Sequence, residues 1–488
     1  MIAYILSAVI VLASLWMVFG RTRNLPPGPM GLPLVGSILT LRKYQLLHDG
    51  LADLRTVYGD VFSMRLGSRL FVVLNGYDAI REAFVGQSDH FSDRPEMLSM
   101  WKAITNHGRG IVGSSGSRWK KSRKFAQGVL RHFGITTRKA NLERQIQEES
   151  RYFVDAVDNT NGKPFEPALL ITGAVANIIN SLVFGERTDY GDEETEKFLG
   201  LVDRIVKLSL KAGAVDVIPL VKYVSPSYKE IVICMEQIFA FVKKKIEEHR
   251  QTFDPNDIRD FIDMYIQEVE SSKLSGSSLS LDDLDMEAAI KDFFFAGIET
   301  TSIGLTWAFM YMVRYPEIQK RIQRDIDRVI GKTRQPCLAD EEELPYVTAT
   351  MLEVLRIASI APTAAPHCVA EDTTLRGYNI PQGTIVIPHI RSVLFDPKLW
   401  PEPEKFNPER FLDKDGKVRR FDEHIPFSTG NRICLGEHLA KMEFFLFFSS
   451  LLQQFTFTIP KGAEPPNMTP LYGVGLKPSI YKLCVERR

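Results

Sequence analysis

The sequence is poor in cysteine and carries no excess charge of either sign. Its 488 residues include only five cysteines, and 60 lysines and arginines balance 60 aspartates and glutamates. The cysteines are scattered, odd in number and form no C-x-x-C pair, which argues against a disulfide framework or a zinc site and favours a reducing compartment. Zero net charge gives no global sign of nucleic-acid binding. Since 44% of the residues are hydrophobic, the chain can bury a large core.

Charged residues are missing from the first twenty positions. This apolar stretch is about long enough to cross a bilayer of ~30 Å, and Arg21, Arg23 and the proline-rich segment Leu25–Pro29 follow it. A cleaved signal peptide is the alternative, but no basic residue precedes the stretch and no clear small-x-small site ends it. The positive flank predicts that the rest of the chain lies in the cytosol. We therefore expect a transmembrane signal anchor at 1–20, a basic and proline-rich hinge at 21–30 and one folded domain at 31–488.

Acidic residues are absent between Met97 and Leu142, a segment in which lysines and arginines gather. Stacking aromatic residues are few there, so this basic patch fits docking of an acidic protein or contact with anionic lipid better than nucleic acid. A solvated helix face is the alternative. Gly108–Gly113 matches G-x-G-x-x-G, but no convincing strand precedes it and no acid follows to hold a ribose. Any nicotinamide electrons must therefore come through a partner.

The hydrophobic pattern predicts a mainly helical protein with small β-sheets. Polar residues within the apolar segment 286–315, which Pro316 ends, favour a long buried helix over a second membrane span. Segment 271–280 is the most linker-like part of the chain. Further helices are expected at 77–85, over most of 119–250, at 346–360 and at 437–455, and hairpins at 60–74 and at 373–387, the second around Pro381–Gly383.

The strongest motif is Phe427–Gly436, which reads F-S-T-G-N-R-I-C-L-G. Its pattern F-x-x-G-x-R-x-C-x-G fixes five positions, so chance does not account for it. Gly430 and Gly436 allow the backbone to turn and to approach a flat cofactor closely. A helix opening at Glu437 would place its positive end near Cys434 and favour the thiolate. We therefore expect this loop to present a thiolate to a haem iron.

A second motif places Glu353 and Arg356 on one face of an apolar helix. The spacing alone is weak, because Glu148 and Arg151 repeat it. The apolar neighbours of the first pair distinguish it, since a buried ion pair must be fully satisfied. Arg410, in the segment F-N-P-E-R-F, is the natural third member.

Together these motifs resemble the cytochrome P-450 superfamily, most closely its animal microsomal, family-2-like branch. The match runs in order through the whole chain: the anchor, the L-P-P-G-P hinge, Trp119-x-x-x-Arg123, Ala296-Gly297-x-Glu299-Thr300, Glu353-x-x-Arg356, F-N-P-E-R-F and the cysteine loop. The resemblance implies a mainly α fold with small sheets (α+β), in which haem lies between the long central helix and the cysteine loop with the last helix.

The resemblance also implies a role for each motif. Cys434 would ligate the iron of haem b (iron protoporphyrin IX), and the haem propionates would be held by Trp119, Arg123, His367, Arg432 and Arg94. Glu353, Arg356 and Arg410 would form a structural triad. Gly297 would leave room over the iron, Thr300 would hydrogen-bond the co-substrate O2, and Glu299 would help to deliver protons. Substrate contacts are expected from Ile104, Ile111, Val112, Leu201, Ile205, Phe295, Ala296, Ala361, Thr363 and Val474.

The predicted function is that of a haem-thiolate monooxygenase on the cytosolic face of the endoplasmic reticulum membrane. It would insert one oxygen atom into a lipophilic small molecule: a fatty acid, a steroid or a xenobiotic. The expected partners are NADPH–cytochrome reductase (a flavoprotein), cytochrome b5 as a second candidate and the lipid bilayer, with no nucleic acid. Asn431 stands where many relatives have a basic residue, which trims the docking patch.

Other functions fit the sequence less well. A haem-thiolate isomerase or dehydratase would act on peroxides without external electrons, and a non-catalytic haem-binding membrane protein would need no oxygen chemistry. The acid–alcohol pair Glu299 and Thr300 argues against both. A single-pass receptor-like protein would leave the cysteine loop unexplained.

Overall fold

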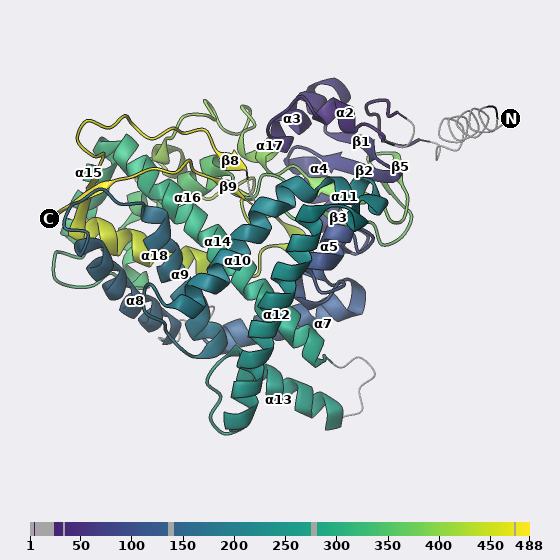
Figure 1. The fold of residues 1–488 in the computed structure, drawn as a ribbon. Helices are drawn as coiled ribbons and strands as arrows, with labels where there is room; N and C mark the ends of the chain where they lie inside the picture. Colours follow the sequence, from purple (N-terminus) through teal and green to yellow (C-terminus); the bar gives the residue numbers. More distant parts are fainter. Residues whose placement is uncertain (1–3, 5–23, 33–34, 135–140, 275–280, 473–474) are drawn as a thin grey trace.

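Helices form the body of the protein, and small sheets lie at its edges (Figure 1). The computed structural model describes residues 4, 24–32, 35–134, 141–274, 281–472 and 475–488. The anchor predicted at 1–20 therefore lies outside the described residues except for residue 4, and most of the linker-like segment lies outside them as well. The prediction of a mainly helical protein with small sheets is confirmed.

The described helices run through the whole chain. The α-helices are α2 (Ile38–Leu41), α3 (Leu47–Tyr58), α4 (Tyr77–Arg81), α5 (Ser99–Ile104), α6 (Gly110–Gly113), α7 (Gly116–His132), α8 (Asn141–Asp158), α9 (Pro167–Phe184), α10 (Glu193–Ala212), α11 (Ala214–Val217), α12 (Pro226–Thr252), α13 (Phe261–Leu274), α14 (Asp283–Arg314), α15 (Pro316–Val329), α16 (Pro345–Ala358), α17 (Arg391–Leu394) and α18 (Glu437–Gln454). Shorter turns of other helix types are η1 (Glu82–Gly86), η2 (Pro219–Tyr223), η3 (Leu338–Glu343), η4 (Pro408–Phe411) and η5 (Gly430–Arg432).

The strands form one four-stranded sheet and three two-stranded pairs. The sheet has the order β1 (Val61–Leu66), β2 (Arg69–Leu74), β6 (Ile385–Pro388) and β3 (His367–Cys368); the pairs are β4 (Thr373–Leu375) with β5 (Tyr378–Ile380), β7 (Phe455–Thr458) with β10 (Cys484–Arg487), and β8 (Leu471–Tyr472) with β9 (Leu476–Lys477). The antiparallel register of β1 and β2 confirms the hairpin predicted at 60–74.

The hairpin predicted at 373–387 is wrong. Its turn lies at Arg376 and Gly377, which both have positive φ, and β4 pairs with β5 across that turn. β6, beyond Pro381, instead pairs in parallel with β2. The Pro-Gln-Gly sequence bends the chain between two different sheets. Turn residues alone do not show whether the strands on either side pair with each other.

The central helix α14 organises the core. Asp282 caps its N-terminus in a reciprocal capping box with Asp285, and Pro316 begins the next helix. Its residues are buried on nearly all sides, and the long helix α9 packs against it. The prediction of a buried central helix is thus confirmed. Among the described residues only α9 is long and apolar enough to cross a membrane, and 67% of that stretch is buried inside the fold, as in a core helix.

Two histidines, the buried His389 and the half-buried His424, join the edge of the core to the sheet and to α16. His389, just after β6, lies 2.8 Å by its Nδ1 from the side-chain oxygen of Asn75. His424 donates from Nε2 to the carbonyl of Leu352 in α16. Burial lowers the pKa of each histidine from 6.5 to about 3. Both rings are therefore neutral in the folded protein at neutral pH.

Acid should destabilise the protein before its ordinary carboxylates titrate. Below pH 6.5 the unfolded chain takes up protons on these histidines while the folded protein does not, so the free energy of unfolding falls as the pH falls toward 3. Each histidine contributes up to about 1 kcal/mol per pH unit. Urea unfolding between pH 6.5 and 5 should show this slope, and His424→Gln should reduce it. An unchanged slope in that variant would contradict the assignment.

Candidate functional site

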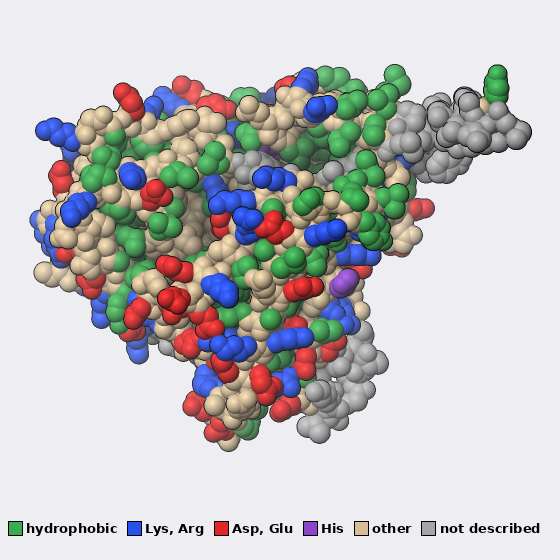
Figure 2. Space-filling model, in the orientation of Figure 1, with side chains coloured by type: hydrophobic (Ala, Val, Ile, Leu, Met, Phe, Trp, Pro, Cys, Tyr) green, Lys and Arg blue, Asp and Glu red, His purple; other side chains and the backbone are tan. Residues whose placement is uncertain are grey.

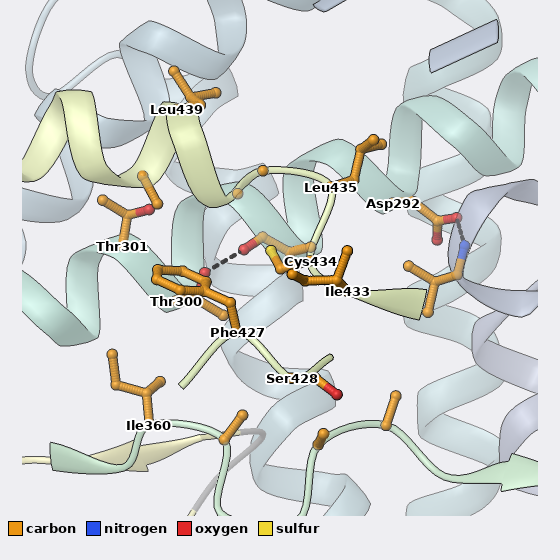
Figure 3. A pocket seen from close by; sticks show the side chains of 18 of the residues that line it. Asp292, Thr300, Thr301, Ile360, Phe427, Ser428, Ile433, Cys434, Leu435 and Leu439 are labelled. Carbon is orange, nitrogen blue, oxygen red and sulfur yellow. Dashed lines mark hydrogen bonds between the residues drawn. The ribbon is translucent and has the colours of Figure 1, made fainter. Parts of the chain in front are cut away.

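The cysteine loop lies at the wall of an apolar cavity of about 360 Å³ (Figure 3). Cys434 donates its backbone N–H to the carbonyl of Phe427, which closes the loop just before α18. Gly430 has a φ of +77°, and a Cβ there would lie 1.9 Å from the backbone oxygen of Phe84. Only glycine fits this position. At Gly436 φ is −90° and an added Cβ meets no atom of the described chain within 4 Å, so no contact within the protein requires glycine there.

Two opposing effects act on the thiol of Cys434. Backbone N–H groups of Gly436 and Glu437, at the start of α18, favour the thiolate as expected. Burial outweighs them and raises the pKa of the thiol above its usual value. A thiolate here therefore needs a further positive charge, which a metal ion supplies.

α14 forms another wall of the cavity. Thr300 lines it and donates its hydroxyl to the carbonyl of Ala296 at 2.6 Å, so its lone pairs are free to accept a hydrogen bond (Figure 3). Gly297 lies on the same cavity wall, where the absence of a side chain leaves space. A Cβ on Gly297 would lie 2.6 Å from the Cδ1 atom of Ile179, so the end of that side chain in α9 would have to move if Gly297 were replaced.

Glu299 does not line the cavity with Thr300. Its carboxylate forms an ion pair with the Nζ atom of Lys477 in β9. The structure thus places the two members of the expected acid–alcohol pair on neighbouring faces of α14. Thr300 faces the cavity, and Glu299 faces the C-terminal strand.

Three guanidinium groups converge beside the cysteine loop; we call Arg94, Arg123 and Arg432 the cation cluster. Arg432 is buried over the ring of Trp119 at 3.9 Å and donates to the carbonyls of Ser92, Ile111 and Ser114. Arg94 donates to three further carbonyls, and Arg123 to that of Ile433. In the described part of the chain, none of the three is in an ion pair.

The guanidinium groups of the cation cluster disfavour positive charge on one another and on nearby groups. Burial, together with Arg94 and Arg123, lowers the pKa of Arg432 to about 7. Burial and Arg123 lower the pKa of Arg94 to about 10. Burial and Arg94 also hold the pKa of His367 well below its usual value. Such a cluster is stable only when an anion balances it.

The donor set fits haem. The cation cluster calls for an anionic partner of the kind that two propionates provide, and the buried Nε1 of Trp119 has no acceptor among the described residues. Cys434 lies on the same cavity as Arg94, Arg123, His367 and Arg432. All five side chains predicted to hold the propionates are therefore brought to one region. Their individual roles stay predictions.

The predicted triad forms one buried network. Arg356 donates two hydrogen bonds to Glu353, of 2.7 and 2.9 Å, and Arg410 donates a third of 3.0 Å. The backbone N–H of Asn407 also donates to Glu353. Arg356 further donates to two backbone carbonyls. With Glu353 and Arg356 both fully buried, the network holds α16 against η4.

The residues expected to contact substrate divide into three groups. Ile111, Val112, Ala296 and Ala361 line the cavity. Ile104, Leu201, Ile205, Phe295 and Thr363 are not among its lining residues. Val474 lies outside the described residues.

Sequence reasoning missed two carboxylates that line this cavity. Asp292 accepts hydrogen bonds from the backbone N–H groups of Ile111 and Val112, at 2.7 and 2.8 Å, and pairs with the buried Lys291. It therefore fastens α6 onto α14 (Figure 3). Its spacing from Ala296 and Thr300, four and eight residues, was a signal that all three share one helix face.

The second missed carboxylate is Glu443 in α18. Its side chain is buried, Thr301 hydrogen-bonds to it, and burial raises the pKa of this carboxyl group well above its usual value. An acid directly before the apolar run F-F-L-F-F was the available signal.

The basic patch is partly neutralised inside the structure. Arg109 and Arg118 pair with Asp282 and Asp285 at the start of α14. Arg123 belongs to the cation cluster. Lys120, which pairs with Asp89, and Lys124 stay on the exposed side of α7. The patch available to a partner is therefore smaller than the sequence indicates.

Comparisons with known proteins agree across nearly the whole chain. A family profile described as "Cytochrome P450" matches residues 26–485. The chain is 38% identical to cytochrome P450 2U1 of Rattus norvegicus, over 98% of this chain and 94% of the relative. It is 38% identical to cytochrome P450 2B12 of Rattus norvegicus, over 94% and 93%. It is 37% identical to cytochrome P450 18a1 of Drosophila melanogaster, over 97% and 89%.

Breaking the triad should unfold the protein more readily. Glu353→Ala leaves the fully buried guanidinium of Arg356 without its counter-charge, which costs about 3–5 kcal/mol. Glu148→Ala is the matched control, because Glu148 is exposed, precedes Arg151 by the same three residues and should change stability by less than about 0.5 kcal/mol. Urea unfolding measures both. Equal losses in the two variants would show that burial of the pair is unimportant.

Proposed function

The chain belongs to the cytochrome P450 family and is thus an oxidoreductase of the monooxygenase class that carries haem, and we propose that it oxidises a lipophilic small molecule with O2 and electrons from a flavoprotein reductase. One oxygen atom enters a C–H bond of the substrate. The other takes up two protons and two electrons and leaves as water. The substrate would be a fatty acid, a steroid or a xenobiotic.

One observation carries the proposal: a thiol, an unbalanced cation cluster and a threonine hydroxyl meet on one apolar cavity. The thiol of Cys434 would ligate the iron of haem b. Arg94, Arg123, His367, Arg432 and Trp119 would hold its propionates. When bound, the haem supplies activation of O2, which the thiolate assists. Glu353, Arg356 and Arg410 would keep the fold on this side rigid.

The protein's own residues would position oxygen and exclude water. The hydroxyl of Thr300 is held by the carbonyl of Ala296, which leaves its lone pairs toward the cavity, where a protonated oxygen can donate to them. Glu299 would supply protons to the same region. The lining is mostly apolar, which keeps bulk water out and favours a lipophilic substrate.

The electron donor would dock beside the cysteine loop. Arg123 in α7 donates to the backbone of Ile433 in that loop, so α7 packs next to Cys434. Its exposed Lys120 and Lys124 would meet acidic groups of NADPH–cytochrome reductase, with cytochrome b5 as a second candidate. A haem-thiolate isomerase that acts on peroxides would need no surface that binds an electron donor.

A membrane face supports the proposed location at the endoplasmic reticulum. Large apolar side chains are exposed near the N-terminal side of the domain and around η2: Met30, Leu32, Leu39, Ile218, Leu220, Tyr223 and Val224. Figure 2 shows apolar side chains over this part of the surface. With a signal anchor at 1–20 and a hinge at 21–30, domain 31–488 would rest on the cytosolic face of the bilayer.

The ligand assignment can be tested by spectroscopy. Cys434→Ser replaces the thiolate by a weak alcohol ligand, so the ferrous–CO complex of the full-length variant should lose its strongly red-shifted Soret band. Cys368→Ser, at a buried cysteine of β3, is the matched control and should keep the band. A red-shifted band in Cys434→Ser would exclude this residue as the ligand.

The reaction can be tested with isotope. The full-length protein, reductase, NADPH and 18O2 should convert components of a lipid extract or drug panel into products that carry one labelled atom, detected by mass spectrometry. Thr300→Ala should lower product per electron roughly tenfold or more and release peroxide instead. Turnover of a peroxide without reductase or O2 would instead support the isomerase.

A further inference from the structure

Lys477 joins three elements that are far apart in the sequence. It lies in β9, and its ammonium pairs with Glu299 of α14. It also lies 3.8 Å from the carboxylate of Asp203 in α10. The side chain of Lys477 is 29% exposed, that of Glu299 15% and that of Asp203 44%, so this ion-pair cluster is largely buried at Glu299 and open to water at Asp203. Asp203 also pairs with Lys207 of α10 at 2.5 Å.

The backbone around Lys477 is fixed. Leu476, directly before it, donates to the carbonyl of Ile360 at 2.8 Å and accepts from the indole N–H of Trp307 at 2.8 Å. Farther along, the hydroxyl of Tyr481 donates to the carbonyl of Thr306 at 2.7 Å. Two of these three bonds attach the C-terminal segment to α14 itself. The Lys477 ammonium therefore reaches Glu299 from a rigid support.

Helix geometry turns Glu299 away from the direction of Thr300, and the pairing holds its carboxylate there. Successive helix residues project about 100° apart, so Glu299 cannot share the direction of Thr300. Ala296 and Thr300 line the cavity, and Glu299 does not. Its carboxylate is instead drawn toward β9 and α10 by the Lys477 charge.

We propose that Lys477 is a positioning residue for the reaction. It keeps the Glu299 carboxylate on the β9 side of α14. Because Lys477 also interacts with Asp203, the strength of its ion pair with Glu299 depends on the position of α10. The inference rests on the proposed function, in which Glu299 supplies protons. α10 also carries Leu201 and Ile205, two expected substrate contacts. A substrate that shifts α10 changes the distance from Asp203 to Lys477 and thereby the hold on Glu299.

Hydrogen exchange tests the ion-pair cluster without reference to activity. In the haem-loaded full-length protein, Lys477→Met should speed amide exchange in residues 201–208 about two- to fivefold, the range that a partly exposed ion pair supports. Asp203→Asn should do the same, and Lys477→Arg should restore slow exchange. Lys482→Met, at an exposed lysine of the same C-terminal segment, is the control. Unchanged exchange in Lys477→Met overturns the coupling to α10.

Product yield per electron tests whether Lys477 acts through Glu299. Lys477→Met should lower this yield about two- to fivefold and change its solvent deuterium isotope effect. It should add nothing in a Glu299→Gln background. An equal loss in both backgrounds overturns the proposal, because Lys477 would then act elsewhere. Absence of any 18O-labelled product from the unaltered protein contradicts the proposed function instead, and hydrogen exchange still decides on the ion-pair cluster.

Discussion

Positive charge buried without a partner is the constraint on which this structure depends. Arg94, Arg123 and Arg432 surround one end of the cavity, and in the described residues they bond only to neutral carbonyl groups. Burial and the neighbouring guanidinium groups lower the pKa of both Arg94 and Arg432, the direction expected where positive charge is costly to keep. A bound anion would neutralise these guanidinium groups and offset this cost. The charge of the cluster, like the apolar shape of the cavity, therefore fits the haem that the family implies.

α14 connects this constraint to the rest of the site. Asp292 fastens α6 to it, Thr300 faces the cavity, and Glu299 is turned toward β9. Asp292 and Thr300 lie on the face of the helix that lines the cavity, and Glu299 leaves the helix toward β9. The buried helix thus presents two polar groups to the cavity and a third to the C-terminal segment from one rigid element.

Motifs with strict local geometry were predictable from the sequence. The cysteine loop turns at Gly430 with a positive φ, which favours glycine, and the i, i+3 pair of Glu353 and Arg356 needs only one helix. The parallel pairing of β6 with β2 was not predictable, because it joins residues that are far apart in the sequence. The partner of Glu299 was missed for the same reason. Lys477 is close to it only after the C-terminal segment has folded back on α14.

The kind of contact also separates the parts of the site whose sequence can vary little from the parts whose sequence can vary more. Arg432 of the cation cluster and the triad are held by buried hydrogen bonds, which leave little room for variation. α10 is instead held to the C-terminal segment through partly exposed charges, and its Leu201 and Ile205 do not line the cavity. Such ion pairs change cheaply, since each contributes about 1 kcal/mol or less. The position of α10 is therefore expected to change more readily with sequence than that of the haem-binding loop.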